Sequence, residues 1–294
     1  MVLRDKIIKT LLLSVPRMND REPYPSTGDF AAHITARLQR ESGALAERWS
    51  HSGPVKHLVL DNLLPEEWAR EIASAFPSMS RLRRYESLKE RKGIGVEMDA
   101  YPPILKSITF AFQDADVIAA VAGITGIPQL NPDRNLYSSG LSSMGEGDFL
   151  NPHIDNSGNP FLSQYRRINA LYYVSPGWKA AWGGSLELWD ARRSHPISLE
   201  ARFNRLILMN TNRSSFHSVN PLRGCGGNFR ICVSNYYFSA QSPEARDYFH
   251  VTSFRGRPEQ PARDLYLRLD AWARGVYRRL HPRKAKSVKH RYGN

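Results

Sequence analysis

The chain has 294 residues, of which 41% are hydrophobic and 23% are charged. These fractions are ordinary for a globular protein and exclude overall disorder, and the length allows one large domain or two small ones. Two cysteines, Cys225 and Cys232, are too few for a disulfide framework, so we expect a reducing compartment and place the protein in the cytoplasm. No stretch approaches the apolar length of a transmembrane helix, so no membrane span is expected.

The net charge of +13 is concentrated at the carboxyl-terminal end. From residue 255 to residue 294 there are twelve Lys and Arg residues against three acidic ones, whereas the rest of the chain is nearly balanced. We interpret this segment as a solvated helix with a basic tail. Nucleic acid, anionic lipid and acidic proteins are the partners that such charge attracts. Nucleic acid is not expected, because no RNA-binding motif of interleaved aromatic and basic residues accompanies the tail.

Residues 1–133 are predicted to form a helical region with one short strand, packed on the domain that follows. Apolar residues at helical spacing, and proline at helix starts, define its elements. In chain order they are a fraying helix over 1–16, an amphipathic helix over 28–49, a short strand over 57–61, a helix from Pro65 to Phe76 and a helix from Pro102 toward Gly126.

The segment from Arg81 to Gly95 stands apart within this region. It is rich in Arg, Lys and Glu and lacks apolar periodicity, so we expect a mobile surface loop. Loops of this length next to a catalytic barrel are often lids.

Residues 134–254 consist of short runs of Tyr, Val, Ile and Leu punctuated by Gly, Pro, Asn and Ser. Such closely spaced strands predict an all-β core, and a double-stranded β-helix, or jelly roll, is the first choice. Residues 255–294 return to a helical pattern. The expected fold is therefore a jelly-roll core with flanking amino- and carboxyl-terminal helices. The clearest strands are 168–175, 184–189, 205–210 and 229–238.

Three residues of this core are candidate metal ligands. His153 and Asp155 are two positions apart, so in an extended chain their side chains point to the same face and reach one ion. A second strand that carries His217 completes the set. Two imidazoles and one carboxylate leave three adjacent octahedral positions open, as in iron(II) oxygenases. Taken alone, a His-x-Asp spacing is more typical of two surface polar residues.

The context of these residues carries a resemblance to a known family. The segment from about Asn135 to Ser239, roughly a third of the chain, resembles the prolyl-4-hydroxylase-like branch of the 2-oxoglutarate and iron(II)-dependent dioxygenases. The order and spacing of the motifs agree throughout. The matching pieces are HIDN at 153–156, LYYV at 171–174, GGSLELW at 183–189, RLILMN at 205–210, SFHSV at 215–219 and FRICVS at 229–234.

The resemblance implies roles for three further residues. Arg230 occupies the position at which family members bind the distal carboxylate of 2-oxoglutarate, a task that suits the planar guanidinium. Its alternative role is an internal salt bridge with Glu187 or Asp190. Tyr173 matches a position whose hydroxyl supports the same carboxylate, the alternative being core packing. Asn169 either points toward the co-substrate or is a structural amide.

The implied activity is hydroxylation of an unactivated C–H bond in a small molecule or in a prolyl or amino-acid-type substrate, with release of succinate and CO2. It requires Fe(II), 2-oxoglutarate and O2, with ascorbate as reductant. Asp155 favours hydroxylation, because a halogenating relative has a small residue there. Desaturation or cyclisation on the same iron, and a non-catalytic jelly-roll binding module, are the alternatives. Ser142 and Ser143 depart from the family, since many relatives place an aromatic hydroxyl near them.

Overall fold

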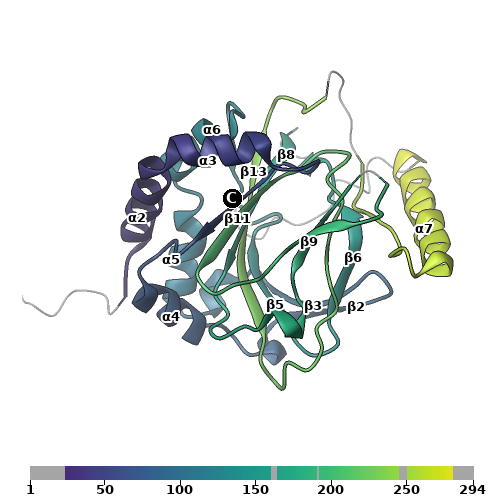
Figure 1. Cartoon of the computed structure of the whole chain (residues 1–294), viewed down its shortest axis with the longest axis horizontal. Helices are drawn as coiled ribbons and strands as arrows, with labels where there is room; N and C mark the ends of the chain where they lie inside the picture. The colour runs from purple at the N-terminus through teal and green to yellow at the C-terminus, as the bar shows by residue number, and fades with distance from the viewer. Residues whose placement is uncertain (1–23, 160–163, 191, 245–249, 281–294) are drawn as a thin grey trace, which may run out of the picture.

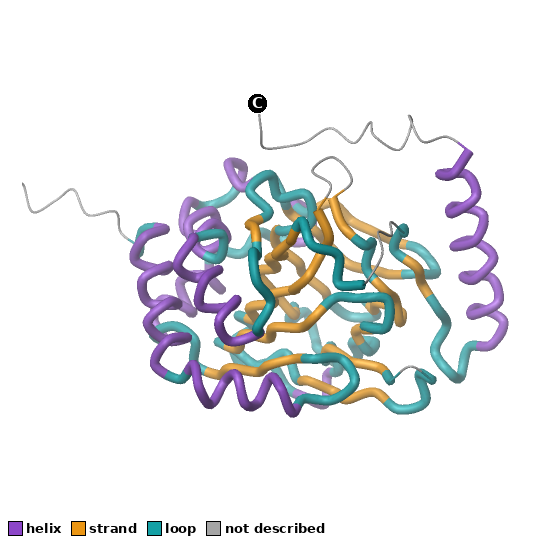
Figure 2. Tube along the Cα trace, turned by 90° about the horizontal axis from the view of Figure 1, so that it is seen from above, coloured by secondary structure: helices purple, strands orange, loops and turns teal. Residues whose placement is uncertain are grey.

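The computed structural model describes residues 24–159, 164–190, 192–244 and 250–280. The helix expected over 1–16 lies outside these residues. Helices gather on one side of a curled antiparallel sheet, and the carboxyl-terminal helix lies on the opposite side (Figure 1). Figure 2, seen from above, shows the strands between these two helical parts.

The amino-terminal region is helical, as predicted, but two of the expected helices are each split in two. The first breaks at Glu41, and the second begins again at Asp114, whose side chain accepts a hydrogen bond from the amide of Asp116 and caps a new helix. The predicted apolar periodicity of the helices is correct, whereas the position of each break is set by the backbone at a single residue. The helices are α2 (Thr27–Arg40), α3 (Ser42–His51), α4 (Glu66–Ser74), α5 (Pro103–Ala111) and α6 (Ala115–Thr125).

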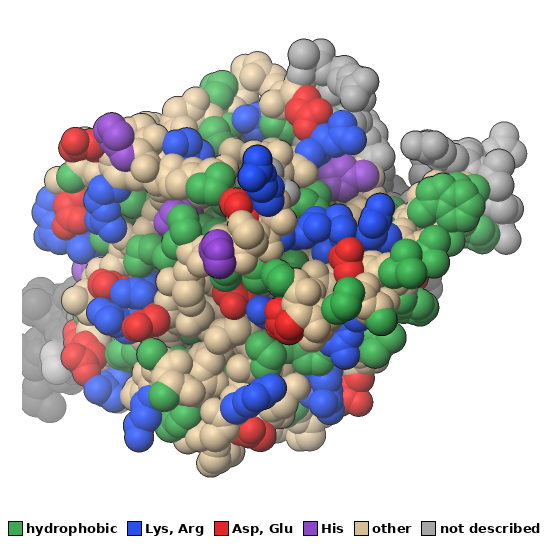
Figure 3. All heavy atoms as spheres, turned by 45° about the vertical axis from the view of Figure 1, so that its right-hand side comes forward, with side chains coloured by type: hydrophobic (Ala, Val, Ile, Leu, Met, Phe, Trp, Pro, Cys, Tyr) green, Lys and Arg blue, Asp and Glu red, His purple; other side chains and the backbone are tan. Residues whose placement is uncertain are grey.

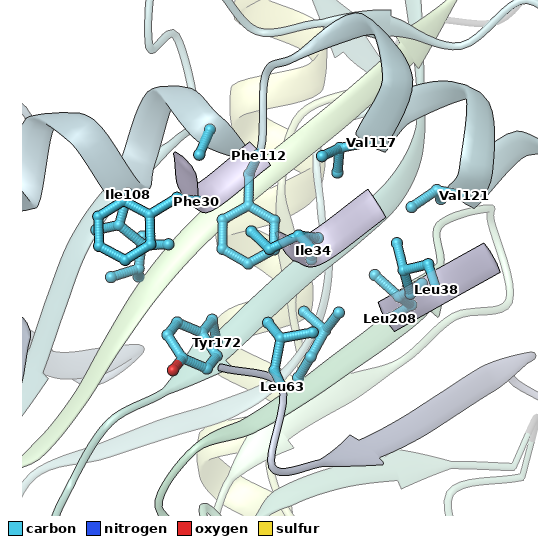
Figure 4. Packing of buried hydrophobic residues seen from close by; sticks show 14 of the residues in the cluster. Phe30, Ile34, Leu38, Leu63, Ile108, Phe112, Val117, Val121, Tyr172 and Leu208 are labelled. Atoms are coloured by element: carbon cyan, nitrogen blue, oxygen red, sulfur yellow. The ribbon is translucent and has the colours of Figure 1, made fainter. Parts of the chain in front are cut away.

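The main hydrophobic core lies between these helices and the outer face of the sheet (Figure 4). Phe30 and Ile34 of α2 and Phe112, which follows α5, are fully or almost fully buried there. From the sheet side, Tyr172 and Leu208 pack against them. The amino-terminal helices therefore cover one face of the sheet and leave the other face to line the barrel.

The sheet is a curled antiparallel half-barrel, which confirms the predicted jelly-roll core. Its central path runs β1–β11–β8–β13–β5–β3–β6–β12–β9–β10. The strands are β1 (His57–Asp61), β2 (Arg83–Glu86), β3 (Glu90–Gly95), β4 (Asn131–Pro132), β5 (Gly140–Met144), β6 (Phe149–Ile154), β7 (Gly158–Asn159), β8 (Gln164–Tyr173), β9 (Leu186–Trp189), β10 (Pro196–Leu199), β11 (Arg205–Asn210), β12 (His217–Val219), β13 (Arg230–Ser239) and β14 (Ser253–Phe254).

Strand β8 contributes apolar side chains to both faces of this sheet. Ala170 and Tyr172 belong to the core under the helices, whereas Leu171 and Tyr173 belong to a second hydrophobic cluster on the inner side. A strand covered on both faces reads as a continuous apolar run, which is why residues 168–175 were easy to predict. Alternation along β8 then decides which side chains line the barrel.

The expectation of a mobile surface loop over residues 81–95 was wrong. These residues form the hairpin β2–β3, and β3 pairs with both β5 and β6 inside the sheet. The polar side chains of β3 do not indicate a strand. Main-chain pairing with the strands on either side, and not an apolar pattern, holds it in place. Gly93 and Gly95 allow close packing: a Cβ added to Gly93 would lie 2.5 Å from the sulfur of Met79.

Helix α7 (Pro261–Leu280) follows β14 and confirms the predicted carboxyl-terminal helix. The proposed boundaries at residues 133 and 255 stay predictions. In the described residues no single helix is long and apolar enough to cross a membrane, and α5 with α6 satisfies that test only as a pair bent by 43°.

Candidate metal centre

The structure brings His153, Asp155 and His217 together at one end of the barrel. His153 lies near the end of β6, and His217 begins β12 directly opposite it in the antiparallel pair. Asp155 follows β6 two residues after His153, so both side chains lie on one face. One ligand atom from each of the three side chains lies within 4.8 Å of the others, a grouping that can hold one metal ion.

The two imidazole rings are oriented for metal binding by their own backbone neighbourhoods. The Nδ1 atom of His153 lies 3.0 Å from the carbonyl oxygen of Asn151, and Nδ1 of His217 lies 3.0 Å from that of Ser215. Because a carbonyl only accepts hydrogen bonds, Nδ1 carries the proton in each ring and Nε2 keeps its lone pair. Both Nε2 atoms face the Asp155 carboxylate, at 3.5 and 3.7 Å.

The electrostatics of the cluster keep Asp155 and His217 in their metal-binding protonation states. Burial alone would raise the pKa of Asp155, but the guanidinium of Arg166 and the two histidines hold it well below its usual value. Burial, together with the neighbouring His153, lowers the pKa of His217 to about 4. At neutral pH the site therefore offers a carboxylate and a neutral imidazole, the forms that bind a cation.

Asn169, for which the sequence left two roles open, donates from Nδ2 to the Oδ2 atom of Asp155 at 2.8 Å. Its Oδ1 atom is buried and has no hydrogen-bond partner among the described residues. Buried polar atoms are nearly always paired, so this acceptor indicates that a donor from outside the described residues, such as a water or a ligand, belongs beside it.

Arg166 is a neighbour of the centre that sequence reasoning missed. Its Nη1 atom lies 3.0 Å from Oδ2 of Asp155, and its guanidinium lies 4.4 Å from the ring centroid of Tyr236. Alternation from Tyr173 would place Arg167 inside and Arg166 outside. A bulge between β8 and β13 adds one residue at Arg167 and reverses the alternation, a feature that the sequence does not signal.

Arg230 lies at the other end of the same inner face. It is 4% exposed, donates from Nε to the carbonyl of Gly184 at 2.6 Å and from Nη2 to the hydroxyl of Tyr173 at 3.0 Å. Within the described residues no carboxylate lies within ion-pair distance of it. The alternative salt bridge with Glu187 is absent, because Glu187 pairs with Arg257 at 2.6 Å.

A cavity of about 110 Å³ joins the two ends of the site. On β13 the residues that line it alternate from Arg230 through Cys232 and Ser234 to Tyr236, and β8 contributes Tyr173, Leu171 and Asn169 opposite them. The lining therefore begins at a guanidinium that has no carboxylate partner in the described residues, and it ends beside the metal cluster.

Two polar cavity residues come from other strands, and of these Lys92 had no signal in the sequence. Lys92 lines the cavity from β3, the strand that its polar composition concealed, and Ser142 lines it from β5. As the sequence indicated, β5 carries serines and no aromatic hydroxyl at positions 142 and 143. Tyr236 brings a phenol to the cavity from β13 instead, and burial raises its pKa, so it stays protonated.

The donor set of this cluster fits Fe(II). Two imidazoles and one carboxylate, with nothing else from the described residues among the ligand atoms, match the facial arrangement of non-haem iron oxygenases. A jelly roll with such a cluster at one end of its barrel and a buried arginine at the other is the arrangement of a non-haem iron oxygenase.

The comparison with protein families agrees with this class. Residues 139–238 match the model of the 2OG-Fe(II) oxygenase superfamily, which identifies the barrel as a 2-oxoglutarate-dependent oxygenase domain and confirms the resemblance predicted from the sequence. None of the curated proteins matches the chain.

Solved structures show the same fold. A prolyl 4-hydroxylase from Phytophthora capsici is 17% identical and superposes with a TM-score of 0.53 over 93% of this chain and 85% of that one. A prolyl hydroxylase from Trichoplax adhaerens, in complex with a hypoxia inducible factor peptide, gives 17%, a TM-score of 0.49, and coverage of 69% and 91%. HygX from Streptomyces hygroscopicus, with nickel and 2-oxoglutarate, gives 14%, 0.46, and 71% and 90%. At 17% identity the likeness to the Phytophthora capsici structure concerns the fold alone.

Proposed function

We propose that this oxygenase is a hydroxylase in which His153, Asp155 and His217 bind Fe(II), while Arg230 and Tyr173 bind the distal carboxylate of 2-oxoglutarate. The proposal rests on the buried guanidinium of Arg230. It has no carboxylate partner in the described residues, and it shares one cavity with the three candidate ligands. A buried positive charge without a counter-charge is costly, so an anion is expected to occupy the space before it.

The roles of the protein groups follow from their chemistry. Bound iron would supply the activation of O2 and the oxidative decarboxylation of 2-oxoglutarate to succinate and CO2. The Arg230 fork matches a carboxylate in two hydrogen bonds, and the Tyr173 hydroxyl, whose pKa burial raises, remains a donor. Arg166 and Asn169 fix the orientation of the Asp155 carboxylate through two contacts to Oδ2.

The substrate class that the cavity supports is a polar small molecule or a prolyl or amino-acid-type group. Lys92, Ser138, Ser142 and Tyr236 bring hydrogen-bonding groups to the cavity. Retention of Asp155 as the candidate carboxylate ligand favours return of a hydroxyl group. Ascorbate is proposed as the reductant that keeps the iron ferrous.

The test has two stages. Purified protein is first titrated with Fe(II) under anaerobic conditions, and we expect one iron per chain and a 2-oxoglutarate-dependent change in the visible spectrum. Succinate formation is then measured over a substrate panel with Fe(II), 2-oxoglutarate and ascorbate. A product heavier by one oxygen atom supports hydroxylation, whereas loss of two hydrogens indicates desaturation or cyclisation. If the protein does not bind one iron per chain, the proposal is wrong and the remaining function is that of a non-catalytic jelly-roll binding module.

A further inference from the structure

Helix α7 carries its apolar face away from the body of the protein. Five of the eight large hydrophobic side chains that are exposed in the described residues lie on this one helix. Leu265, Leu269 and Trp272 are 59%, 58% and 70% exposed, and Tyr266 and Tyr277 flank them at 53% and 52%. Figure 3 shows hydrophobic side chains gathered over the exposed side of α7. We call these five residues the outer face of α7.

The opposite face of α7 is held to the barrel by polar contacts. Asp264 accepts two hydrogen bonds from Arg255, at 2.7 and 2.8 Å, and Asp270 pairs with Lys89 at 2.7 Å. Arg274 adds a bond to Asp270 at 2.8 Å, and among the residues described on this helix Leu267 is the fully buried apolar one. Rotation of the helix to bury its outer face would break the ion pairs with Arg255 and Lys89, so the outer face is fixed in its exposed position.

Basic side chains border the outer face, and the two aspartates of the helix are already paired. Both aspartates of α7 are paired with cations, whereas Arg268 is exposed and forms no ion pair within the described residues. Arg193 lies close by: burial and the charges of Arg255 and Arg268 lower its pKa. The rim of the outer face is therefore positively charged and attracts an anionic partner.

We propose that the outer face of α7 binds the surface of a lipid bilayer that contains anionic headgroups. A helix with Trp, Tyr and Leu on one side and arginines beside it lies in the plane of the interface, with the apolar side chains among the acyl chains and the guanidiniums at the phosphates. At about 1.5 Å per residue, the 20 residues of α7 extend over about 30 Å of surface.

The charges argue against two other partners. A second copy of the chain would bring the same arginine rim, including Arg193 and Arg268, against itself, and like charges across an interface oppose association. A nucleic acid would meet the arginines but leave the five apolar side chains in water, with no gain from their exposure. An anionic bilayer satisfies both the apolar face and its rim.

The test is co-sedimentation of the full chain with phosphatidylcholine vesicles, with and without about a third phosphatidylglycerol. We expect binding to the anionic vesicles that weakens with salt. In Trp272→Glu, with circular dichroism to confirm folding, the apparent affinity should fall at least about tenfold. Ile197→Glu, at an exposed apolar position on β10 that is 38% exposed, is the matched control and should bind as the unaltered chain does.

Three outcomes would overturn the proposal. The first is no binding to anionic vesicles. The second is vesicle binding that Trp272→Glu leaves unchanged, which would assign the binding to basic residues elsewhere in the chain. The third is a dimer in sedimentation velocity without lipid that Trp272→Glu dissociates, which would assign the outer face to self-association. Loss of binding in Trp272→Glu together with unchanged binding in Ile197→Glu supports the bilayer.

Discussion

At the scale of single residues, the candidate centre depends on how each imidazole is fixed. The rings of His153 and His217 are 4.1 Å apart, and Phe254 stacks on His153 at 4.9 Å. These contacts hold the rings in place without a metal. The histidines are therefore expected to matter for iron binding more than for folding.

We predict that His153→Ala or His217→Ala abolishes iron binding and turnover while leaving a folded protein, because each removes one candidate ligand from a barrel held by other contacts. Iron content and succinate formation are the measurements, with circular dichroism for the fold. The exposed His195 provides the control, and His195→Ala should behave as the unaltered protein does. Near-normal activity with full iron in either ligand variant would contradict the assignment.

Arg166 allows a separate prediction. Its contact with Oδ2 of Asp155 orients the carboxylate, and substitution of such supporting groups typically lowers metal affinity about 10- to 100-fold. Arg166→Gln should therefore weaken Fe(II) binding by about that factor, as measured by anaerobic titration. The neighbouring Arg167, which donates to the carbonyl of Gln241, supplies the control variant Arg167→Gln, with unchanged affinity expected. Equal Fe(II) affinities in the two variants would show that Arg166 does not support metal binding.

Arg230→Gln tests the other end of the cavity. The change keeps much of the side-chain length but removes the charge, and hydrogen bonds to charged groups contribute about 1.5–3 kcal/mol. The KM for 2-oxoglutarate should rise about 10- to 150-fold, with turnover at saturation partly preserved and iron binding little changed.

The control for this prediction is another buried arginine. Arg205 bonds Asp61 at 2.5 and 2.9 Å and does not line the cavity. Arg205→Gln should lower the unfolding temperature without raising the KM for 2-oxoglutarate. An unchanged KM in Arg230→Gln would mean that a different basic residue, such as Lys92 in the same cavity, binds the co-substrate.

At the scale of elements, α7 is attached to the barrel mainly by charge, and this attachment has a pH dependence. The hydrogen bond from Arg255 lowers the pKa of Asp264 from its usual 3.8. A carboxyl whose folded pKa is depressed contributes stability above its unfolded pKa, and this contribution is lost as the pH falls through the folded value.

Asp264→Asn removes this titration. Above about pH 3.8 the unaltered protein should have the higher unfolding temperature, and the difference from Asp264→Asn should shrink as the pH falls below that value. Thermal unfolding of both proteins across this range measures the effect. A difference that stays constant with pH would show that the Arg255 contact does not stabilise the helix through charge.

At the scale of the whole molecule, the metal cluster and the cavity lie in the barrel. We therefore predict that removal of the residues after Pro282 leaves 2-oxoglutarate turnover intact. The kcat and KM of the truncated and full chains, measured side by side, test this. A truncated protein that folds and binds iron but is inactive would place part of the active site in the tail.

The sequence by itself determined the motif-bearing strands and the candidate residues. The apolar runs of β8, β11 and β13 are long and buried, so hydrophobicity alone marks them, and the spacing of His153 and Asp155 follows from the period of a strand. The amphipathic pattern of α7 is equally local.

Only the tertiary structure decided the features that depend on partners distant in sequence. Strand β3 is polar and is held by main-chain pairing with β5 and β6, so its side-chain pattern does not predict a strand. The bulge that turns Arg166 toward Asp155 depends on the register between β8 and β13. The orientation of α7 depends on Lys89 and Arg255, which draw its charged side to the barrel and leave its apolar side outward, against the usual burial of such a face. Local spacing fixes which residues are available, whereas pairing between distant segments fixes which way they face.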